Sequence, residues 1–323
     1  MVVVHAPDDC AGLRIDRFLR RQLPHVPLSR IYRMIRTGGV RVGGKQVGQQ
    51  YRLAAADAVE MAVAVEEVRQ ENVSRSEAVA RLAGTAFFRT MFRVVFEDEC
   101  LIVCDKPPGL VVHPGSGHPS DDSLIELAQA HMLRSRAGAD RRPYLVHRLD
   151  RDTSGVILIA KDRAGLVALH EAMREGRIDK RYECVCHGAP RRPAGVIELN
   201  LAKTFERNDG TKVTAAENGQ FSRSRYTVVQ TRGGLSLVAV RLETGRTHQI
   251  RVHMAHIGCP IVGDVRYGDA AADGRLPVAS GPSKRLYLHA HSITFPHPLS
   301  RQRITVDSPR PEQFRALLDS VRP

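Results

Sequence analysis

Residues 145–155, LVHRLDRDTSG, stand directly before the apolar run VILIA and crowd a histidine, two arginines and two aspartates into a few positions. The last four residues of this stretch, DTSG, are all turn-forming types. We therefore expect a strand that ends near Leu149, a turn, and a buried strand over 156–160. This arrangement would place Asp150 at the end of a strand, where a rigid element presents its side chain.

Asp150 lies between Arg148 and Arg151 in this stretch. Two flanking cations favour the ionised form of a carboxylate, which suits a nucleophile or an electrostatic group better than a general acid. A structural role, in which Asp150 caps the turn or pairs with Arg151, explains the local spacing equally well. The residues of this stretch leave both interpretations open.

From residue 94 onward, short runs of Val, Ile and Leu alternate with turns rich in Gly and Pro. YECVCHG and LSLVAVRLETG have the pattern of strands, whereas GLVALHEAMREG and PEQFRALLDSV have helical spacing of apolar residues. The pattern predicts a strand-rich α+β unit over 93–320. Residues 66–92 are mixed in charge and weakly patterned, and we interpret them as a linker.

A smaller unit is expected over 13–65. LRIDRFLRRQL has apolar residues at helical spacing with arginines between them, and VPLSRIYRMIRTGG repeats the pattern with Ser29 as a candidate N-cap. VRVGGKQV then has the Gly-Gly pair of a two-residue hairpin. Two basic helices followed by a hairpin are therefore predicted.

Charge is concentrated in this small unit. The chain has a net charge of +13, and residues 12–60 contain ten Lys and Arg against three acids, a net charge of +7. Any one of these arginines fits an ordinary solvated surface, but so many like charges on a small unit favour a polyanionic partner such as nucleic acid. The candidate RNA-binding residues here are Arg14, Arg17, Arg30, Arg33 and Arg36.

Several classes of protein and site are disfavoured. The six cysteines form no CxxC pair, so we expect reduced thiols and no zinc site. No apolar run approaches the roughly 18 residues of a membrane span, and the N-terminus lacks the features of a signal peptide, so a cytoplasmic location is expected. KPPGLVVHPGSG at 106–117 lacks both glycine-rich nucleotide motifs, so we expect no nucleotide cofactor.

A second polar block, LETGRTHQIRVHMAHIGCPIVGD, occupies 242–264 and runs from a strand into a helix. Arg251 and His248 are expected on one face of that helix. His253 and His256 have the spacing of metal ligands, but no nearby acid or cysteine completes a convincing set, so no metal is expected.

Taken together, these blocks resemble a known family. HRLDRDTSG at 147–155 is similar to the signature of the RluA family of pseudouridine synthases, and related blocks follow in family order: KRYECVCHG at 180–188, TGRTHQIRVH at 244–253 and RLYLHAHSITFPHP at 285–298. KPPGLVVHPGSG stands upstream, as in the family. Residues 13–60 independently resemble an S4 RNA-binding domain of the αL type.

The resemblance implies a catalytic domain with a mixed, mostly antiparallel β-sheet flanked by helices and loops. It implies that the chain isomerises uridines of 23S ribosomal RNA without a cofactor, after flipping the base. Action as a monomer is the simplest expectation. By position, Asp150 would be the catalytic aspartate, Tyr182 would pack on the target base and Arg251 would pair with Asp150. Arg148 would fill the gap left by the base, and the pocket walls would include Leu149, Ile250 and Val252.

Two other functions compete with this one. The chain could be a non-catalytic S4-type assembly factor that binds ribosomal RNA, although the intact HRLD motif argues against it. A glycoside hydrolase would need a second carboxyl group with a raised pKa, and Asp152 is the nearest candidate in the sequence. Residues 202–230 do not align with the family residue by residue, so the choice of target uridine stays open.

Overall fold

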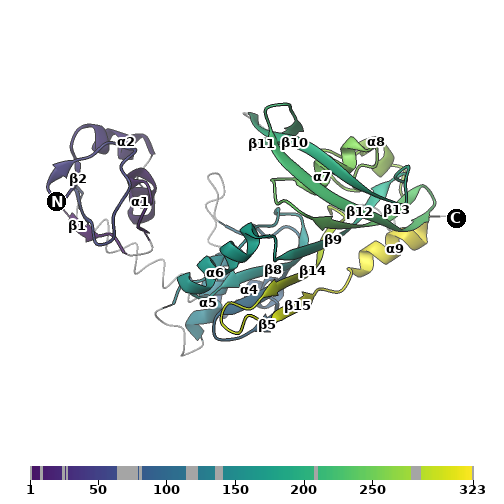
Figure 1. Cartoon of the computed structure of the whole chain (residues 1–323), viewed down its shortest axis with the longest axis horizontal. Helices are drawn as coiled ribbons and strands as arrows, with labels where there is room; N and C mark the ends of the chain where they lie inside the picture. The colour runs from purple at the N-terminus through teal and green to yellow at the C-terminus, as the bar shows by residue number, and fades with distance from the viewer. Residues whose placement is uncertain are drawn as a thin grey trace. The chain divides into compact units, whose positions relative to one another are not determined.

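The computed structural model describes residues 2–7, 10–23, 26, 28–63, 79, 82–113, 123–134, 141–206, 210–277 and 285–321. The chain forms two compact units, Met1–Ala80 and Arg81–Pro323 (Figure 1). Most of the expected linker 66–92, like residues 114–117 of the KPPGLVVHPGSG block, lies outside the described residues. The end of the expected linker forms the short helix α4 (Ala86–Met91) within the larger unit. No described helix has the length and apolar composition needed to span a membrane.

The N-terminal unit contains the two predicted helices, α1 (Ile15–Gln22) and α2 (Leu28–Arg36). The helix α2 begins one residue before Ser29, so Ser29 lies in its first turn and the predicted N-cap is wrong. The four strands of this unit form an antiparallel sheet in the order β1-β4-β2-β3. Their bounds are β1 (Val2–His5), β2 (Val40–Val42), β3 (Lys45–Gln46) and β4 (Ala58–Met61).

Glycine makes the hairpin between β2 and β3. Gly43 and Gly44 have φ angles of 54° and 77°, and a two-residue turn with two positive φ angles matches the twist of the strands it joins. The predicted hairpin is therefore confirmed. The strand β1 precedes the expected unit 13–65 and pairs with β4, so the N-terminal residues complete this sheet.

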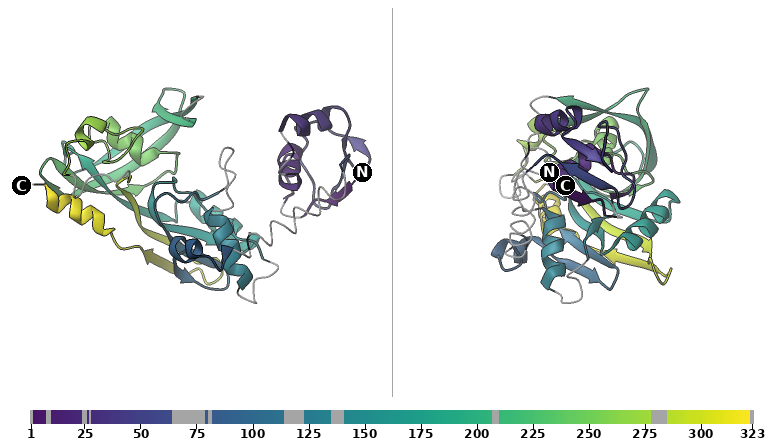
Figure 2. Two further views of the ribbon diagram at one scale, coloured as in Figure 1. Left: turned by 180° about the vertical axis from the view of Figure 1, so that it is seen from behind. Right: turned by 90° about the vertical axis from the view of Figure 1, so that its left-hand side faces the viewer.

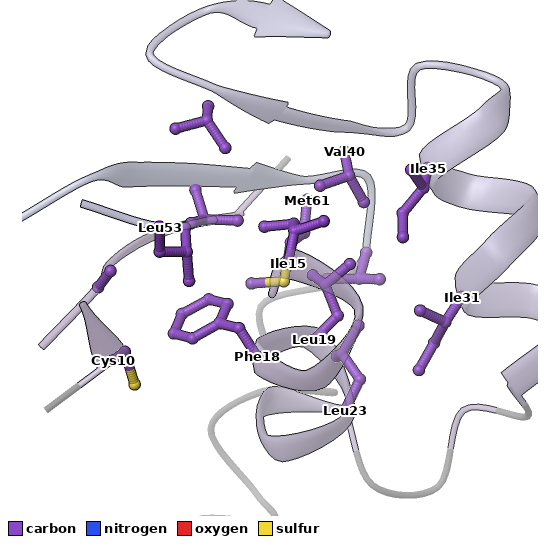
Figure 3. Packing of buried hydrophobic residues seen from close by; sticks show 14 residues of the cluster. Cys10, Ile15, Phe18, Leu19, Leu23, Ile31, Ile35, Val40, Leu53 and Met61 are labelled. Carbon is purple, nitrogen blue, oxygen red and sulfur yellow. The ribbon is translucent and has the colours of Figure 1, made fainter. Parts of the chain in front are cut away.

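The apolar faces of α1 and α2 pack on this sheet (Figure 3). Ile15, Phe18 and Leu19 of α1 are fully buried or nearly so, and the α2 residues Ile31 and Ile35 join them. Because the apolar residues of each helix lie on one face, the intervening arginines remain on the other.

The larger unit is built on an 11-stranded sheet, with the order β11-β10-β12-β13-β9-β14-β8-β6-β5 and with β15 and β7 paired to β14 and β8. The strand pairs are antiparallel except for the parallel pair β14 and β8. The strands are β5 (Val94–Glu97), β6 (Leu101–Lys106), β7 (Tyr144–Leu145), β8 (Ser154–Ala160), β9 (Asp179–His187), β10 (Ala194–Glu206), β11 (Gly210–Ala215), β12 (Gln220–Arg232), β13 (Leu235–Leu242), β14 (Leu288–Pro296) and β15 (Arg303–Asp307). The expected mixed, mostly antiparallel α+β architecture is confirmed.

Helices flank this sheet (Figures 1 and 2). The helix α6 packs on β8 and β14, α7 packs on β10, β11 and β12, and α9 packs through Phe314 against Tyr287 at the start of β14. Their bounds are α5 (Leu124–Arg134), α6 (Arg163–Arg174), α7 (Gln249–His256), α8 (Ala270–Asp273) and α9 (Glu312–Ser320).

The strand before Asp150 ends earlier than predicted. β7 stops at Leu145 instead of Leu149, because the side chain of His147 takes the place of the backbone pairing. Val146 still donates its N–H to the carbonyl oxygen of Leu158, at 3.2 Å, but the N–H of Leu158 is bound by Nε2 of His147 at 3.1 Å. Asp150 therefore lies in an irregular segment that is hydrogen-bonded to β8, not at the end of a strand.

Candidate active site

A cavity of about 910 Å³ brings together three of the sequence blocks that were singled out as candidates for function. Residues 147–150, the start of β9 and residues 241–250 line it, with side chains of α6 on a further side. Arg148, Leu149, Asp150, Tyr182 and Ile250 lie in its wall. Arg148 is exposed, whereas Leu149 and Ile250 are buried.

Val252 does not line this cavity, contrary to the prediction. It lies elsewhere on α7 and packs in an apolar cluster with Leu201 and Val213. Two positions along a helix turn a side chain by about 200°, so Ile250 and Val252 cannot both face one pocket. The pocket prediction for Val252 is therefore wrong.

The segment that carries Asp150 is held by a buried lysine. Lys106, fully buried at the end of β6, donates hydrogen bonds from Nζ to the carbonyl oxygens of Pro107, Leu110 and Arg151 at 2.9, 2.9 and 2.7 Å. Burial lowers the pKa of Lys106 to about 7. The KPPG turn thus supports the Asp150 segment, a role that no sequence pattern had indicated.

Arg151 contributes through its backbone. Its carbonyl oxygen accepts from Lys106 and from the N–H of Gly109, while its side chain forms an exposed ion pair with the neighbouring Asp152. The turn that follows is closed by a hydrogen bond of 3.2 Å from the N–H of Thr153 to the carbonyl oxygen of Asp150.

Arg251 is the partner of Asp150 across the fold. Its Nη1 donates to Oδ2 of Asp150 at 3.1 Å, although the two residues are 101 positions apart in the sequence. The family resemblance predicted this pair. The other oxygen of this carboxylate, Oδ1, has no hydrogen bond with any described residue, and Asp150 lines the cavity. One side of the carboxylate is therefore held while the other stays available.

A second carboxylate, which sequence reasoning missed, holds Arg251. Asp264 accepts from Nε and Nη2 of Arg251, both at 2.7 Å, and its side chain is only 1% exposed. Burial alone would raise the pKa of Asp264, but the hydrogen bonds and charge of Arg251, with backbone N–H groups of Arg266 and Tyr267, outweigh it and lower that pKa. The pair of bonds fixes the plane of the guanidinium, so Arg251 presents Nη1 to Asp150 in a defined direction.

Tyr182 lies on β9 with its ring in the cavity wall and 6% of its surface exposed. Burial and then the charge of Asp150 raise the pKa of Tyr182, so its phenol is neutral. Its hydroxyl makes no hydrogen bond with the described residues. The ring offers an apolar face and one unoccupied polar atom beside Asp150.

Two more titratable groups of the cavity wall were not predicted. Burial lowers the pKa of Lys180, whose amine has no hydrogen-bond partner among the described residues. Burial also lowers the pKa of His147 to about 3, with the charge of Lys180 adding to the effect. His147 is therefore neutral, which agrees with its acceptor role toward Leu158.

The two histidines with ligand-like spacing have different surroundings. His253 is buried against the hydroxyl of Ser222, at 2.8 Å, while His256 is exposed.

Within the described part of the chain, a different cluster brings three potential ligand atoms within 4.8 Å of one another. It consists of Asp98, Cys100 and His297. Because Ser300 donates its N–H to Nδ1 of His297, the ring proton lies on Nε2, which donates to Asp98 at 2.9 Å. A metal needs that Nε2 lone pair, so these residues fit a hydrogen-bonded network and not a metal.

The predicted arginines of the N-terminal unit differ in availability. Arg17, Arg30, Arg33 and Arg36 are exposed on α1 and α2. Arg14 is bound by Asp16 through two hydrogen bonds of 3.1 and 2.9 Å. Four of the five arginines therefore have guanidinium groups free of carboxylates within the described residues.

Comparison with known proteins agrees with this architecture. A family model described as RNA pseudouridylate synthase matches residues 100–256, and the S4 domain model matches residues 13–59. The chain therefore belongs to the RluA family of pseudouridine synthases, which are isomerases, and carries an N-terminal S4 domain.

Within this family, the chain is similar over nearly its whole length to proteins named ribosomal large subunit pseudouridine synthase C. The protein of that name from Salmonella typhi is 38% identical over 323 residues, which cover 99% of this chain and 96% of the relative. Its counterpart from Escherichia coli (strain K12) is 37% identical over 322 residues, with the same coverage.

Solved structures share the fold of the larger unit. Human RNA Pseudouridylate Synthase Domain Containing 4 is 25% identical, with a TM-score of 0.60, over 76% of this chain and 97% of that one. Human RNA Pseudouridylate Synthase Domain Containing 1 is 21% identical, with a TM-score of 0.54, and supports the fold alone.

Proposed function

We propose that the chain isomerises specific uridines of large-subunit (23S) ribosomal RNA, with Asp150 as the catalytic carboxylate and the target base flipped into the cavity. The observation that carries the proposal is that Asp150, which lines that cavity, is bound by Arg251. The relatives are named as pseudouridine synthases of the ribosomal large subunit, which supports the choice of RNA.

The reaction needs little besides a positioned carboxylate and a dry pocket. The N1–C1′ bond of uridine breaks, the uracil turns, and C5 bonds to C1′ while the C5 hydrogen is lost and N1 gains one. Atoms and electrons balance without an oxidant, a phosphate donor or a consumed water. Asp150 suits this chemistry because Arg251 holds one of its oxygens and the other remains available to the nucleotide.

Tyr182 and Arg148 fit the two ends of a flipped nucleotide. The buried ring of Tyr182 offers a flat surface for the uracil beside Asp150. Arg148 is exposed at the cavity and its side chain makes no hydrogen bond with the described residues, so this side chain is free to enter the space that the base leaves in the RNA stack. Unstacking a base costs about a few kcal/mol, which contacts to the RNA must offset.

The S4 domain supplies such contacts in this proposal. Its exposed arginines are suited to phosphates, and a tethered second domain raises the effective concentration of RNA at the cavity. We further propose that the protein acts as a monomer in the cytoplasm; the six cysteines, all free thiols, are consistent with a reducing compartment.

The cavity does not favour a glycoside hydrolase. Asp152 has a side chain 39% exposed and is paired with Arg151, which is unlike the apolar setting of a general acid. Of the carboxylates that line the cavity besides Asp150, Asp179 and Glu243 are each bound by two arginines. Among the described residues of the cavity wall, Asp150 therefore has no second carboxyl group in the apolar setting that a general acid needs.

The test compares the wild type with Asp150→Asn on an unmodified 23S rRNA transcript, with pseudouridines mapped by carbodiimide adducts and reverse-transcriptase stops. We expect new stops with the wild type and a loss of rate of more than about 1000-fold in the variant. Asp152→Asn is the matched control, because it neutralises an exposed carboxylate two residues away, and it should retain activity. A wild type that produces no stops would refute the proposal, and release of free uracil would indicate a hydrolase.

A further inference from the structure

His248 has an unusual backbone at the edge of the cavity. It directly precedes α7 with φ 54° and ψ 18°, a left-handed conformation that is unfavourable for residues other than glycine. Its side chain lines the cavity beside Asp150. Backbone strain at such a place often serves to aim a side chain.

Tyr267 determines which nitrogen of His248 carries the proton. The hydroxyl oxygen of Tyr267 accepts the N–H of Val213 at 2.9 Å and lies 2.8 Å from Nδ1 of His248. The hydroxyl has a single proton and no other acceptor among the described residues, so it donates that proton to Nδ1. The ring proton of His248 is therefore on Nε2.

Nε2 faces Asp150 across a gap. It lies 3.8 Å from Oδ2 of Asp150, which is too far for a direct hydrogen bond. Burial lowers the pKa of His248 despite the opposing charge of Asp150, which agrees with a neutral ring that donates from Nε2. The same tyrosine ring lies under the guanidinium of Arg251, 5.1 Å from Cζ to the ring centre, so both neighbours of Asp150 rest on Tyr267.

The gap between an N–H donor and a carboxylate acceptor fits a hydroxyl group. An oxygen about 2.8 Å from each atom would accept from Nε2 and donate to Oδ2. In the reaction proposed above, Asp150 works at C1′ of the target nucleotide, and the 2′-hydroxyl is attached to the adjacent carbon. The N3–O4 edge of uracil also pairs a donor with an acceptor, but it lies on the side of the base away from C1′.

We propose that His248 and Asp150 together bind the 2′-hydroxyl of the target nucleotide, with His248 held in the Nε2–H tautomer by Tyr267. This inference rests on the proposed function. It assigns to His248 a direct contact with the substrate and to Tyr267 a positioning role. Because DNA lacks the hydroxyl, the contact would also select RNA at the reacting nucleotide.

The first experiment is a double-mutant cycle between protein and RNA. The substrate is a 23S rRNA fragment with either uridine or 2′-deoxyuridine at the mapped target, and the enzymes are the wild type, His248→Leu and His248→Gln. Leu and Gln at position 248 have the same unfavourable left-handed backbone as His248, so the two variants differ mainly in the side chain. Gln retains an N–H donor of similar reach, whereas Leu has none. His256→Gln, an exposed residue of the same helix, is the control and should behave as the wild type.

We expect the deoxy substitution to lower kcat/KM of the wild type about tenfold, and His248→Leu to lower it by a similar factor on RNA. In His248→Leu the deoxy substitution should then have almost no further effect, while His248→Gln should retain part of the discrimination. Independent, multiplicative effects would overturn the proposal and would point to the uracil edge instead. Circular dichroism melts would confirm that each variant is folded.

The second experiment needs no activity. Histidine-selective ¹⁵N labelling and NMR report the tautomer of each imidazole, and the signal lost in His248→Gln belongs to His248. We expect the Nε2–H tautomer in the wild type and a mixture in Tyr267→Phe, which keeps the ring under Arg251 but removes the hydroxyl. An Nδ1–H tautomer in the wild type would refute this inference even if the enzyme is active, whereas absent synthase activity would refute the proposed function separately.

Discussion

Arg251 divides its guanidinium between two carboxylates that differ in burial. Asp264 is almost fully buried and binds Nε and Nη2, while Asp150 is partly exposed and binds Nη1. Asp264 pairs with the guanidinium group of Arg251 and fixes its orientation. The Nη1 group that binds Asp150 is therefore held in one place. A carboxylate outside the cavity thereby controls the geometry inside it.

Asp264→Asn tests this arrangement. Breaking a buried pair typically destabilises a protein by about 3–5 kcal/mol, and loss of the fixed guanidinium should lower kcat more than it raises KM. The free energy of unfolding, from urea titrations followed by circular dichroism, and steady-state kinetics would measure both.

The difference in unfolding free energy between the wild type and Asp264→Asn should depend on pH with a defined sign. The pKa of Asp264 is lowered in the folded state, so its contribution to stability is complete above the pKa of an unfolded aspartate, about 4, and is lost as the pH falls through the folded value. The difference in unfolding free energy between wild type and Asp264→Asn should therefore be constant from pH 7 to about 5 and shrink at more acidic pH. A difference that grows with acidity would contradict this account.

At the scale of elements, the site depends on the parallel pair of strands β8 and β14. Gly155 lies in register with Ala290, has φ 111°, and leaves no space for a side chain, because an added Cβ would lie 2.2 Å from the carbonyl oxygen of Ala290. This close approach sets the start of β8 next to β14, five residues after Asp150. The turn that carries Asp150 therefore inherits its position from the sheet.

Gly155→Ala should destabilise the larger unit by at least about 3 kcal/mol, since the new methyl group cannot be accommodated without moving a strand. Gly176→Ala is the matched control, because Gly176 also has a positive φ, 69°, but has nothing within 4 Å of an added Cβ. Its expected destabilisation is about 1 kcal/mol. Thermal unfolding of both variants measures the two destabilisations. Equal destabilisation would show that the positive φ angle alone, and not the close approach to Ala290, accounts for the effect at Gly155.

At the scale of the whole molecule, the charged side chains of the two units have different surroundings. Of the net charge of +13, residues 12–60 carry +7, and the arginines of α1 and α2 lie on the helix faces that point away from the core. In the larger unit, many charged groups near the cavity are paired with each other, as with Asp179 and Glu243. The S4 domain thus offers free cations, whereas several charges near the cavity, those of Asp179 and Glu243 among them, stabilise the structure of the synthase domain.

Replacement of Arg17, Arg30, Arg33 and Arg36 by Gln should weaken binding of a 23S rRNA transcript and flatten its salt dependence. If each arginine contacts one phosphate, the slope of log K against log salt should fall by about 3. Filter binding over a series of KCl concentrations measures it. Arg14→Gln alone should have a smaller effect than Arg17→Gln, because Asp16 already binds Arg14, and the reverse order would show that the ion pair opens on RNA.

Some features were predictable from the residues because their causes are local. The helices of the N-terminal unit follow from the spacing of residues such as Phe18 and Ile31, the hairpin from Gly43 and Gly44, and the strand β8 from an unbroken apolar run. Boundaries were less predictable. The strand before Asp150 ended early because His147 binds a backbone group of β8, a contact that no local pattern indicates.

The sequence by itself determined the two-unit organisation, the basic surface and, through its motifs, the family and the candidates Asp150, Tyr182 and Arg251. Only the tertiary structure decided how Asp150 is held: Lys106 under its segment, Asp264 behind Arg251, and Tyr267 beside His248. The physical reason is that helical and strand periodicity depend on neighbours a few residues apart, whereas these contacts join groups 13 to 45 residues apart and exist only once the sheet has formed.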